Sequence, residues 1–158
     1  MKLAPRALPE LLAGRRIASV TGTNGKTTTT HFLTAAVRAE TPDGQRSVVT
    51  NADGANLHHG IVSALGQAPD ATIAVLETDE RVVTDVVAMG SPEVLVLLNF
   101  SRDQLDRNHE LTFLGRDWRA ALEKAAEHGP TVVANACDPL IVWVCQKARH
   151  VIWVDTKP

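Results

Sequence analysis

The chain has 158 residues, of which 16 are basic, 18 are acidic and 44% are hydrophobic, and its net charge is −2. This length and composition fit one globular domain, and the interspersed charges lack the basic patch that nucleic-acid binding requires. No apolar run approaches the roughly 20 residues of a membrane span, and the first residues lack the apolar stretch of a secretion signal. We therefore expect a cytoplasmic protein with no transmembrane segment.

Short β-branched runs alternate with longer helical patterns along the whole chain. This alternation predicts an α/β fold, in which a mostly parallel sheet has helices on both faces. In chain order, the expected strands are 17–21, 47–50, 72–76, 94–98, 131–134 and 151–154. The expected helices are 26–40, 55–65, 80–89, 113–128 and a short one from about residue 139. No repeat or linker divides these elements, so we expect a single domain over 1–158.

The first expected helix carries its apolar residues at helical spacing. Four of them fall on one face: Phe32, Leu33, Ala36 and Val37. Such a stripe predicts that this face packs against the sheet. Thr41-Pro42-Asp43-Gly44 predicts a turn after the helix.

The junction between the first strand and the first helix resembles a phosphate-binding loop. Gly22 and Gly25 allow a sharp turn whose N–H groups point at an anion, and the helix N-terminus adds partial positive charge. Lys26 would add a mobile positive charge near the β- and γ-phosphates, and the Thr27 hydroxyl would ligate the accompanying Mg²⁺. We therefore expect seven consecutive residues to bind a nucleotide: Gly22, Thr23, Asn24, Gly25, Lys26, Thr27 and Thr28.

The strict phosphate-loop pattern requires a glycine five residues before Gly25, where this chain has Val20. An ordinary strand-to-helix turn with a threonine N-cap is therefore the alternative. Two glycines, a lysine and a run of hydroxyls at a strand-to-helix junction favour the phosphate loop.

Polar residues follow each of the next three strands, at 50–53, 77–80 and 99–103. Ligands of open α/β sheets bind beyond the carboxyl ends of the strands, so these segments are expected to share one site with the loop. Glu77 directly follows an apolar run, where its carboxylate would meet the loop-bound Mg²⁺; a solvated glutamate at the strand end is the alternative. Asp79 and Glu80 are interpreted as charges that favour a helix N-terminus.

The cysteines and the paired histidines form no metal-ligand pattern. Cys137 and Cys145 are eight residues apart, which fits neither a zinc site nor a CxxC pair, so reduced core thiols are expected. His58 and His59 are adjacent in an expected helix and point in different directions, so we interpret them as ordinary helix positions.

The loop from Val20 to Thr28 resembles the ATP-binding loop of the Mur ligase superfamily, which uses this shortened form. Three further stretches make the chain similar to the MurT-like members: Gly54-Ala55-Asn56-Leu57, Leu76-Glu77-Thr78-Asp79-Glu80 and Leu98-Asn99-Phe100-Ser101-Arg102-Asp103-Gln104-Leu105-Asp106-Arg107. The resemblance covers residues 11–154 and implies a Mur ligase central ATP-binding domain.

Roles for individual residues follow from this resemblance. Lys26 and Glu77 are implied to be the catalytic residues, with Lys26 on the ATP phosphates and with Thr27 and Glu77 on Mg²⁺. Three further residues are implied to contact the nucleotide or to line its site: Asn56, Asn99 and Asp103. Gln104 stands where the wider family has a metal-binding histidine, and Leu122 where several members have a carbamylated lysine, so no second metal held by those groups is implied.

The resemblance also implies an activity, a partner and a larger protein. MurT-like ligases activate the α-carboxyl of D-glutamate in lipid II, or in a muropeptide, as an acyl phosphate, and ammonia from a GatD-type glutaminase subunit then attacks it. The rest of the ATPase domain, the zinc ribbon and the C-terminal domain of that family are absent from these 158 residues, so a partial domain is expected. A stand-alone P-loop ATPase or nucleotide-binding module and a non-catalytic interaction subunit are the alternatives.

Overall fold

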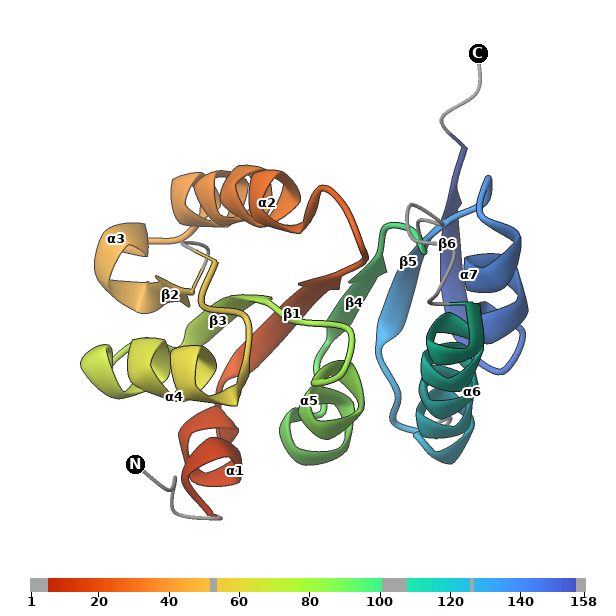
Figure 1. Cartoon of the computed structure of the whole chain (residues 1–158). Helices are drawn as coiled ribbons and strands as arrows, with labels where there is room; N and C mark the ends of the chain where they lie inside the picture. Colours follow the sequence, from red (N-terminus) through yellow and green to blue (C-terminus); the bar gives the residue numbers. More distant parts are fainter. Residues whose placement is uncertain (1–5, 52–53, 101–107, 126, 156–158) are drawn as a thin grey trace.

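A six-stranded, fully parallel sheet forms the centre of the protein (Figure 1). The computed structural model describes residues 6–51, 54–100, 108–125 and 127–155, without the side chains of 108–111. The strand order is β2-β3-β1-β4-β5-β6. The strands are β1 (Arg16–Thr21), β2 (Val48–Thr50), β3 (Ile73–Glu77), β4 (Val94–Leu97), β5 (Thr131–Asn135) and β6 (His150–Val154). All six expected strands are present, so the α/β prediction is confirmed.

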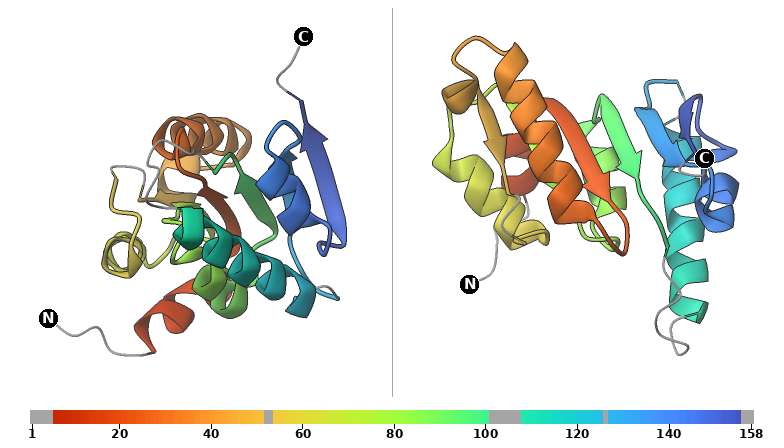
Figure 2. Two further views of the ribbon diagram at one scale, coloured as in Figure 1. Left: turned by 45° about the vertical axis from the view of Figure 1, so that its right-hand side comes forward. Right: turned by 90° about the horizontal axis from the view of Figure 1, so that it is seen from above.

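Helices cover both faces of this sheet, as Figures 1 and 2 show. On one face α2 lies over β1, β2 and β3, and the opposite face carries α1, α4, α5, α6 and α7. The helices are α1 (Ala7–Leu12), α2 (Lys26–Glu40), α3 (Gly44–Ser47), α4 (His58–Gln67), α5 (Val83–Gly90), α6 (Asn108–Lys124) and α7 (Pro139–Cys145). The α1 and α3 helices were not predicted, because six and four residues are too few for a periodic pattern.

Two apolar clusters fill the space between the sheet and its five-helix face. One joins α1, α4 and α5 to the first three strands, and the other joins α5, α6 and α7 to β4 and β5. Trp118 on α6 is the largest fully buried side chain, and its ring lies 4.5 Å from that of Phe100, which follows β4. Burial of each such aromatic or aliphatic side chain contributes roughly 1.5–3 kcal/mol, so α6 is firmly held against the end of β4.

The α2 helix meets the sheet with Thr30 and Thr34 buried and with Leu33 and Val37 half-buried, so only part of the predicted apolar face packs as expected. Thr30 and Thr34 are buried, whereas Phe32 is 73% exposed. The Thr30 hydroxyl donates a hydrogen bond to the Lys26 carbonyl oxygen at 2.8 Å, which satisfies this polar group within the helix. Phe32 and Ala36 are exposed, so the buried side of α2 is rotated away from part of the apolar stripe.

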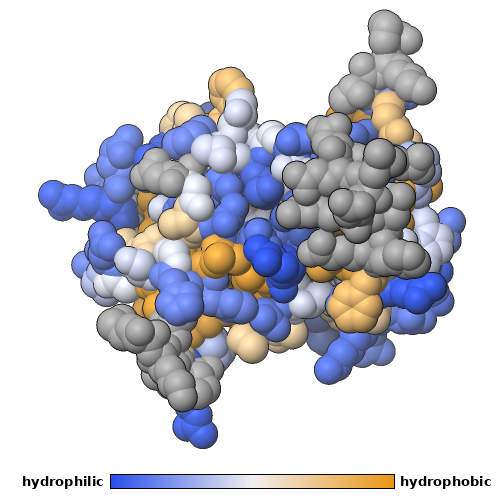
Figure 3. Space-filling model, in the orientation of Figure 1, coloured by the Kyte–Doolittle hydropathy of each residue, from blue (hydrophilic) through white to orange (hydrophobic). Residues whose placement is uncertain are grey.

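Most of the surface on the face seen in Figure 3 is hydrophilic. Exposed apolar side chains occur on β6, the last strand in the order, where Ile152 and Val154 are about half exposed. No helix within the described residues is long and apolar enough to cross a membrane.

Candidate phosphate-binding site

The loop between β1 and α2 packs tightly against the end of β4. Gly22 has φ +142°, and a Cβ atom there would lie 2.8 Å from the Leu98 Cβ atom and 2.9 Å from the Asn99 nitrogen. Gly25, with φ +84°, is the N-cap of α2 and has no side chain to cap the helix. Both glycines are therefore required by the backbone, the first by contact and the second by its left-handed conformation.

Asn99 holds this loop in place. The Thr23 N–H donates to the Asn99 carbonyl oxygen at 2.9 Å, and the Asn24 N–H donates to the Asn99 side-chain oxygen at 2.9 Å. The Asn99 amide also donates to the Asn24 carbonyl oxygen at 3.0 Å. The loop N–H groups of Thr23 and Asn24 are thus engaged, and those that could meet an anion belong to Gly25 and the uncapped first turn of α2.

Glu77 is buried beside the start of the loop. It is the last residue of β3, it lies opposite Val20 in the register with β1, and it is only 2% exposed. Its Oε1 atom accepts a hydrogen bond from the Asn56 amide at 3.0 Å, whereas its Oε2 atom has no partner among the described residues. The solvated strand-end alternative is therefore wrong, and one buried carboxylate oxygen lacks a hydrogen-bond partner among the described residues.

Asn51 fixes Glu77, although its sequence pattern marked it only as part of the polar segment 50–53. The Glu77 N–H donates to the Asn51 side-chain oxygen at 2.9 Å. The Asn51 amide donates to the carbonyl oxygens of Glu77 at 2.8 Å and of Ala55 at 2.9 Å. Its position directly after a strand was the available signal, but the hydrogen bonds depend on the pairing of β2 with β3.

Lys26 is folded back over its own loop. Its ammonium donates to the carbonyl oxygens of Gly22 at 2.6 Å and Thr23 at 3.2 Å, and it lies 3.7 Å from the Glu80 Oε1 atom. Glu80 therefore faces the loop, and the interpretation of Asp79 and Glu80 as helix N-terminal charges is wrong, because α5 begins only at Val83.

Asp79 is instead paired with Arg81, whose Nε atom is 2.9 Å from the Asp79 Oδ1 atom. Burial by itself raises the pKa of Asp79, but the hydrogen bonds and charge of Arg81, together with the charge of Lys26, hold that pKa below its usual value. This edge of the sheet thus carries a carboxylate that stays ionised at neutral pH.

The other residues singled out in the sequence lie in three places: at the loop, in the core, and outside the described residues. Thr27 and Thr28 are exposed on the first turn of α2, and Asn56 lies against Glu77. Asp53, Asp103 and Gln104 lie outside the described residues. Leu122 is buried in the apolar cluster around Trp118. That Thr27, Thr28, Asn56 and Asp103 contact a nucleotide stays a prediction.

The donors at this edge fit a hard cation beside an anion. The free Oε2 atom of Glu77 and the exposed Thr27 hydroxyl are oxygen ligands of the kind that Mg²⁺ prefers. Within the described part of the chain, no group of three or more histidines, cysteines and carboxylates could hold a metal. A cation here would take its other ligands from water or from a bound anion, as Mg²⁺ commonly does.

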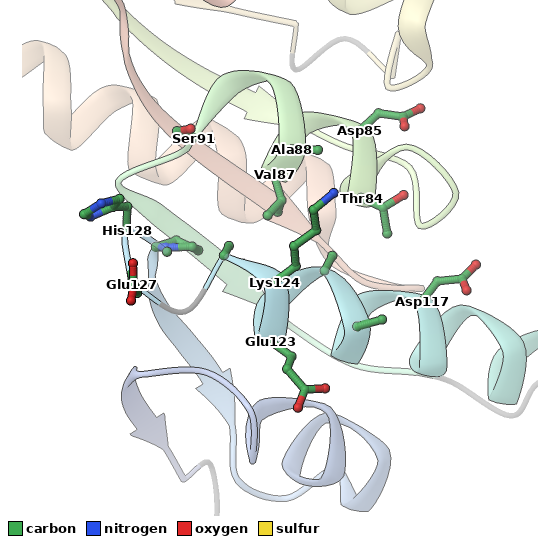
Figure 4. A pocket seen from close by; sticks show the side chains of 15 residues that line it. Thr84, Asp85, Val87, Ala88, Ser91, Asp117, Glu123, Lys124, Glu127 and His128 are labelled. Atoms are coloured by element: carbon green, nitrogen blue, oxygen red, sulfur yellow. The ribbon is translucent and has the colours of Figure 1, made fainter.

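A separate groove of about 670 Å³ lies between α5 and α6 (Figure 4). Small apolar side chains such as Ala88 and Ala121 line it together with charged ones, and Lys124 extends from α6 toward α5. None of the predicted site residues lines this groove.

The parallel sheet, the helices on both of its faces and the glycine-bracketed loop between β1 and α2 place this chain in the class of parallel α/β domains. The model of the Mur ligase middle domain matches residues 20–156, so the chain belongs to the Mur ligase family.

Curated relatives include MurT subunits of lipid II isoglutaminyl synthase (glutamine-hydrolyzing). The Staphylococcus aureus (strain COL) subunit is 33% identical over 127 residues, which cover 79% of this chain and 28% of the relative. The subunit from Streptococcus pneumoniae is 40% identical over 137 residues, which cover 84% of this chain and 29% of the relative. The matched part of the chain thus spans less than a third of these relatives.

A solved structure of UDP-N-acetylmuramoyl-L-alanyl-D-glutamate–2,6-diaminopimelate ligase shares the fold. Its TM-score is 0.66 at 23% identity, and the match covers 97% of this chain and 34% of that one. A structure of UDP-N-acetylmuramoylalanyl-D-glutamyl-2,6-diaminopimelate–D-alanyl-D-alanyl ligase from Acinetobacter baumannii gives a TM-score of 0.64 at 15% identity. At these identities the likeness concerns the fold alone.

Proposed function

We propose that this chain is the nucleotide-binding part of a MurT-like amide ligase and that it binds ATP with Mg²⁺ at the β1–α2 loop. The observation that carries the proposal is Glu77, a buried carboxylate with one unpartnered oxygen in register with the strand that leads into the loop. A buried charge without full compensation costs free energy, so its presence beside an anion-binding loop is best accounted for by a cation ligand.

Each residue has a defined task under this proposal. The Lys26 ammonium binds phosphate oxygens, and the first turn of α2 presents its N–H groups to the same anion. Glu77 and Thr27 hold Mg²⁺, while Asn51 and Asn56 keep the Glu77 carboxylate in place. When bound, Mg·ATP supplies the phosphoryl group that activates a carboxylate for attack by an amine.

The similarity to the MurT subunits supports the choice of substrate and partner. Under the proposal, the activated group is the α-carboxyl of D-glutamate in lipid II or a related muropeptide, and a GatD-type glutaminase supplies the ammonia. The 158 residues act as one partial central domain within that system. Such chemistry requires positioning and charge stabilisation and no nucleophilic side chain.

Titration calorimetry of the chain with ATP tests the nucleotide site. We expect binding that requires Mg²⁺, that Lys26→Ala weakens severely and that Glu77→Gln makes insensitive to Mg²⁺. Lys124→Ala is the matched control, because it removes one exposed lysine from α6, far along the chain from the loop. Equal ATP affinity for the wild type and Lys26→Ala would show that the β1–α2 loop is not the nucleotide site.

Turnover measurements test the ligase part of the proposal. ATP hydrolysis that requires both a muropeptide acceptor and a glutaminase partner supports the amide ligase. ATP hydrolysis at the same rate without the acceptor and without the glutaminase would indicate a stand-alone ATPase instead of an amide ligase.

A further inference from the structure

Glu80 lies against Lys26, and the function proposed above gives it no task. The Lys26 ammonium is 3.7 Å from the Glu80 Oε1 atom, and the two side chains are only 14% and 17% exposed. We propose that Glu80 is a positioning residue: it holds the Lys26 ammonium against the carbonyl oxygens of the loop, and a phosphate that binds there displaces Glu80 from Lys26. This inference rests on the proposed function, because it concerns the same anion site.

The backbone around Glu80 is fixed at several points, so its carboxylate is presented from a rigid segment. The Thr78 N–H donates to the Val20 carbonyl oxygen at 2.9 Å, and the Asp79 N–H donates to the Asn56 carbonyl oxygen at 3.0 Å. The Trp118 indole N–H donates to the Glu80 carbonyl oxygen at 2.8 Å. Because these bonds involve only backbone atoms of the segment, a change of the Glu80 side chain leaves them in place.

The contacts of the Lys26 ammonium decide how its ion pair with Glu80 affects phosphate binding. An ammonium group has three N–H donors, and two of them donate to the carbonyl oxygens of Gly22 and Thr23. The Glu80 carboxylate lies 3.7 Å away, at ion-pair distance, so a phosphate oxygen that approaches the third donor competes with Glu80 for the charge of Lys26. Glu80 is the only full charge among these three partners, and the low exposure of the pair limits screening by water.

Glu80 therefore acts against anion binding in the absence of a cation. Replacing it by glutamine removes the charge that competes with phosphate for the Lys26 ammonium. We expect Glu80→Gln to bind inorganic tripolyphosphate, in the presence of EDTA, about threefold to tenfold more tightly than the wild type.

Asp79→Asn is the matched control. It removes a carboxylate from the neighbouring residue, and that carboxylate pairs with Arg81 and is reached by the charge of Lys26 without the ion pair that Glu80 makes. General repulsion between the acidic segment and the anion would raise the affinity to the same extent in both variants, whereas competition for Lys26 raises it more in Glu80→Gln.

A double-mutant cycle completes the test, with calorimetry of tripolyphosphate as the readout. In a Lys26→Met background, the advantage of Glu80→Gln should fall to that of Asp79→Asn, since no ammonium is left to compete for. Equal effects of Glu80→Gln and Asp79→Asn in the Lys26-containing protein would overturn the inference, and so would an undiminished advantage in the Lys26→Met background. Failure of the proposed function looks different: wild type and Lys26→Met would then bind both tripolyphosphate and Mg·ATP equally.

Discussion

The side chain of Asn51 extends the hydrogen bonding between β2 and β3 by one residue beyond the end of β2. Its amide group both accepts from the Glu77 N–H and donates to the Glu77 carbonyl oxygen, in place of the backbone of a longer strand. The backbone of Glu77 is therefore held beside the loop by a side chain from the neighbouring strand end, while Asn56 bonds its carboxylate.

We expect Asn51→Ala to lower the free energy of unfolding by about 2–4 kcal/mol, because it leaves the two buried backbone groups of Glu77 without partners and also removes the bond to the Ala55 carbonyl oxygen. Urea denaturation measures the change. Ser63→Ala is the control, since it removes an exposed side-chain hydrogen bond to Gln67 and should alter stability by less than about 0.5 kcal/mol. Similar values for the two variants would contradict the structural importance of Asn51.

Glu77→Gln is expected to stabilise the ligand-free protein by about 1 kcal/mol, because it removes a buried and half-partnered negative charge while keeping an oxygen for Asn56. Urea denaturation in EDTA gives the difference. Glu93→Gln provides the comparison, since this exposed partner of Arg16 should contribute little. A less stable Glu77→Gln protein would mean that the charge is compensated in the folded state.

Gly22→Ala should both destabilise the protein and weaken phosphate binding. Its methyl group would lie 2.8 Å from the Leu98 Cβ atom, so the loop would have to move away from β4. We expect a loss of about 2 kcal/mol or more in the free energy of unfolding. Gly66→Ala is the matched control, because a Cβ atom there meets nothing within 4 Å in α4, and it should raise stability by about 0.5 kcal/mol. Calorimetry with tripolyphosphate gives the binding part of the test, and unchanged affinity in Gly22→Ala would contradict the loop assignment.

The buried Cys145 thiol is expected to be unreactive toward thiol reagents in the folded protein and to lower the stability of the fold at high pH. Burial raises the pKa of its thiol to about 12, from 9.0 for an exposed cysteine. Above pH 9 the unfolded chain therefore loses a proton that the folded chain keeps, so the free energy of unfolding falls as the pH rises from 9 toward 12.

Denaturation of the wild type and Cys145→Ala between pH 8 and pH 10.5 measures this effect. The wild type should lose more stability over that range than Cys145→Ala does. An equal loss in the two proteins would show that other groups account for it. At pH 8, thiol reagents should modify Cys145 only in urea.

The structural features that were predicted accurately from the sequence are those that depend on residues close together in the chain. The bounds of α2 were predicted at both ends, because the loop residues set its start and the 41–44 turn follows its end. The rotation of α2 about its axis was not predicted, because the side that meets the sheet combines Thr30 and Thr34 with only part of the apolar stripe and leaves Phe32 exposed. Cys145 lies in the core as expected, whereas Cys137 is only half-buried.

The sequence by itself determined the alternation of strands and helices, the glycine loop ending in Lys26, and the carboxylate of Glu77 at a strand end. These features depend on residues close together in the chain, where periodicity and backbone preference act. Only the tertiary structure decided that β3 lies beside β1, which buries Glu77 next to the loop, and that Glu80 meets Lys26. These contacts join segments about fifty residues apart, so they depend on the order of the strands in the sheet, which no local pattern specifies.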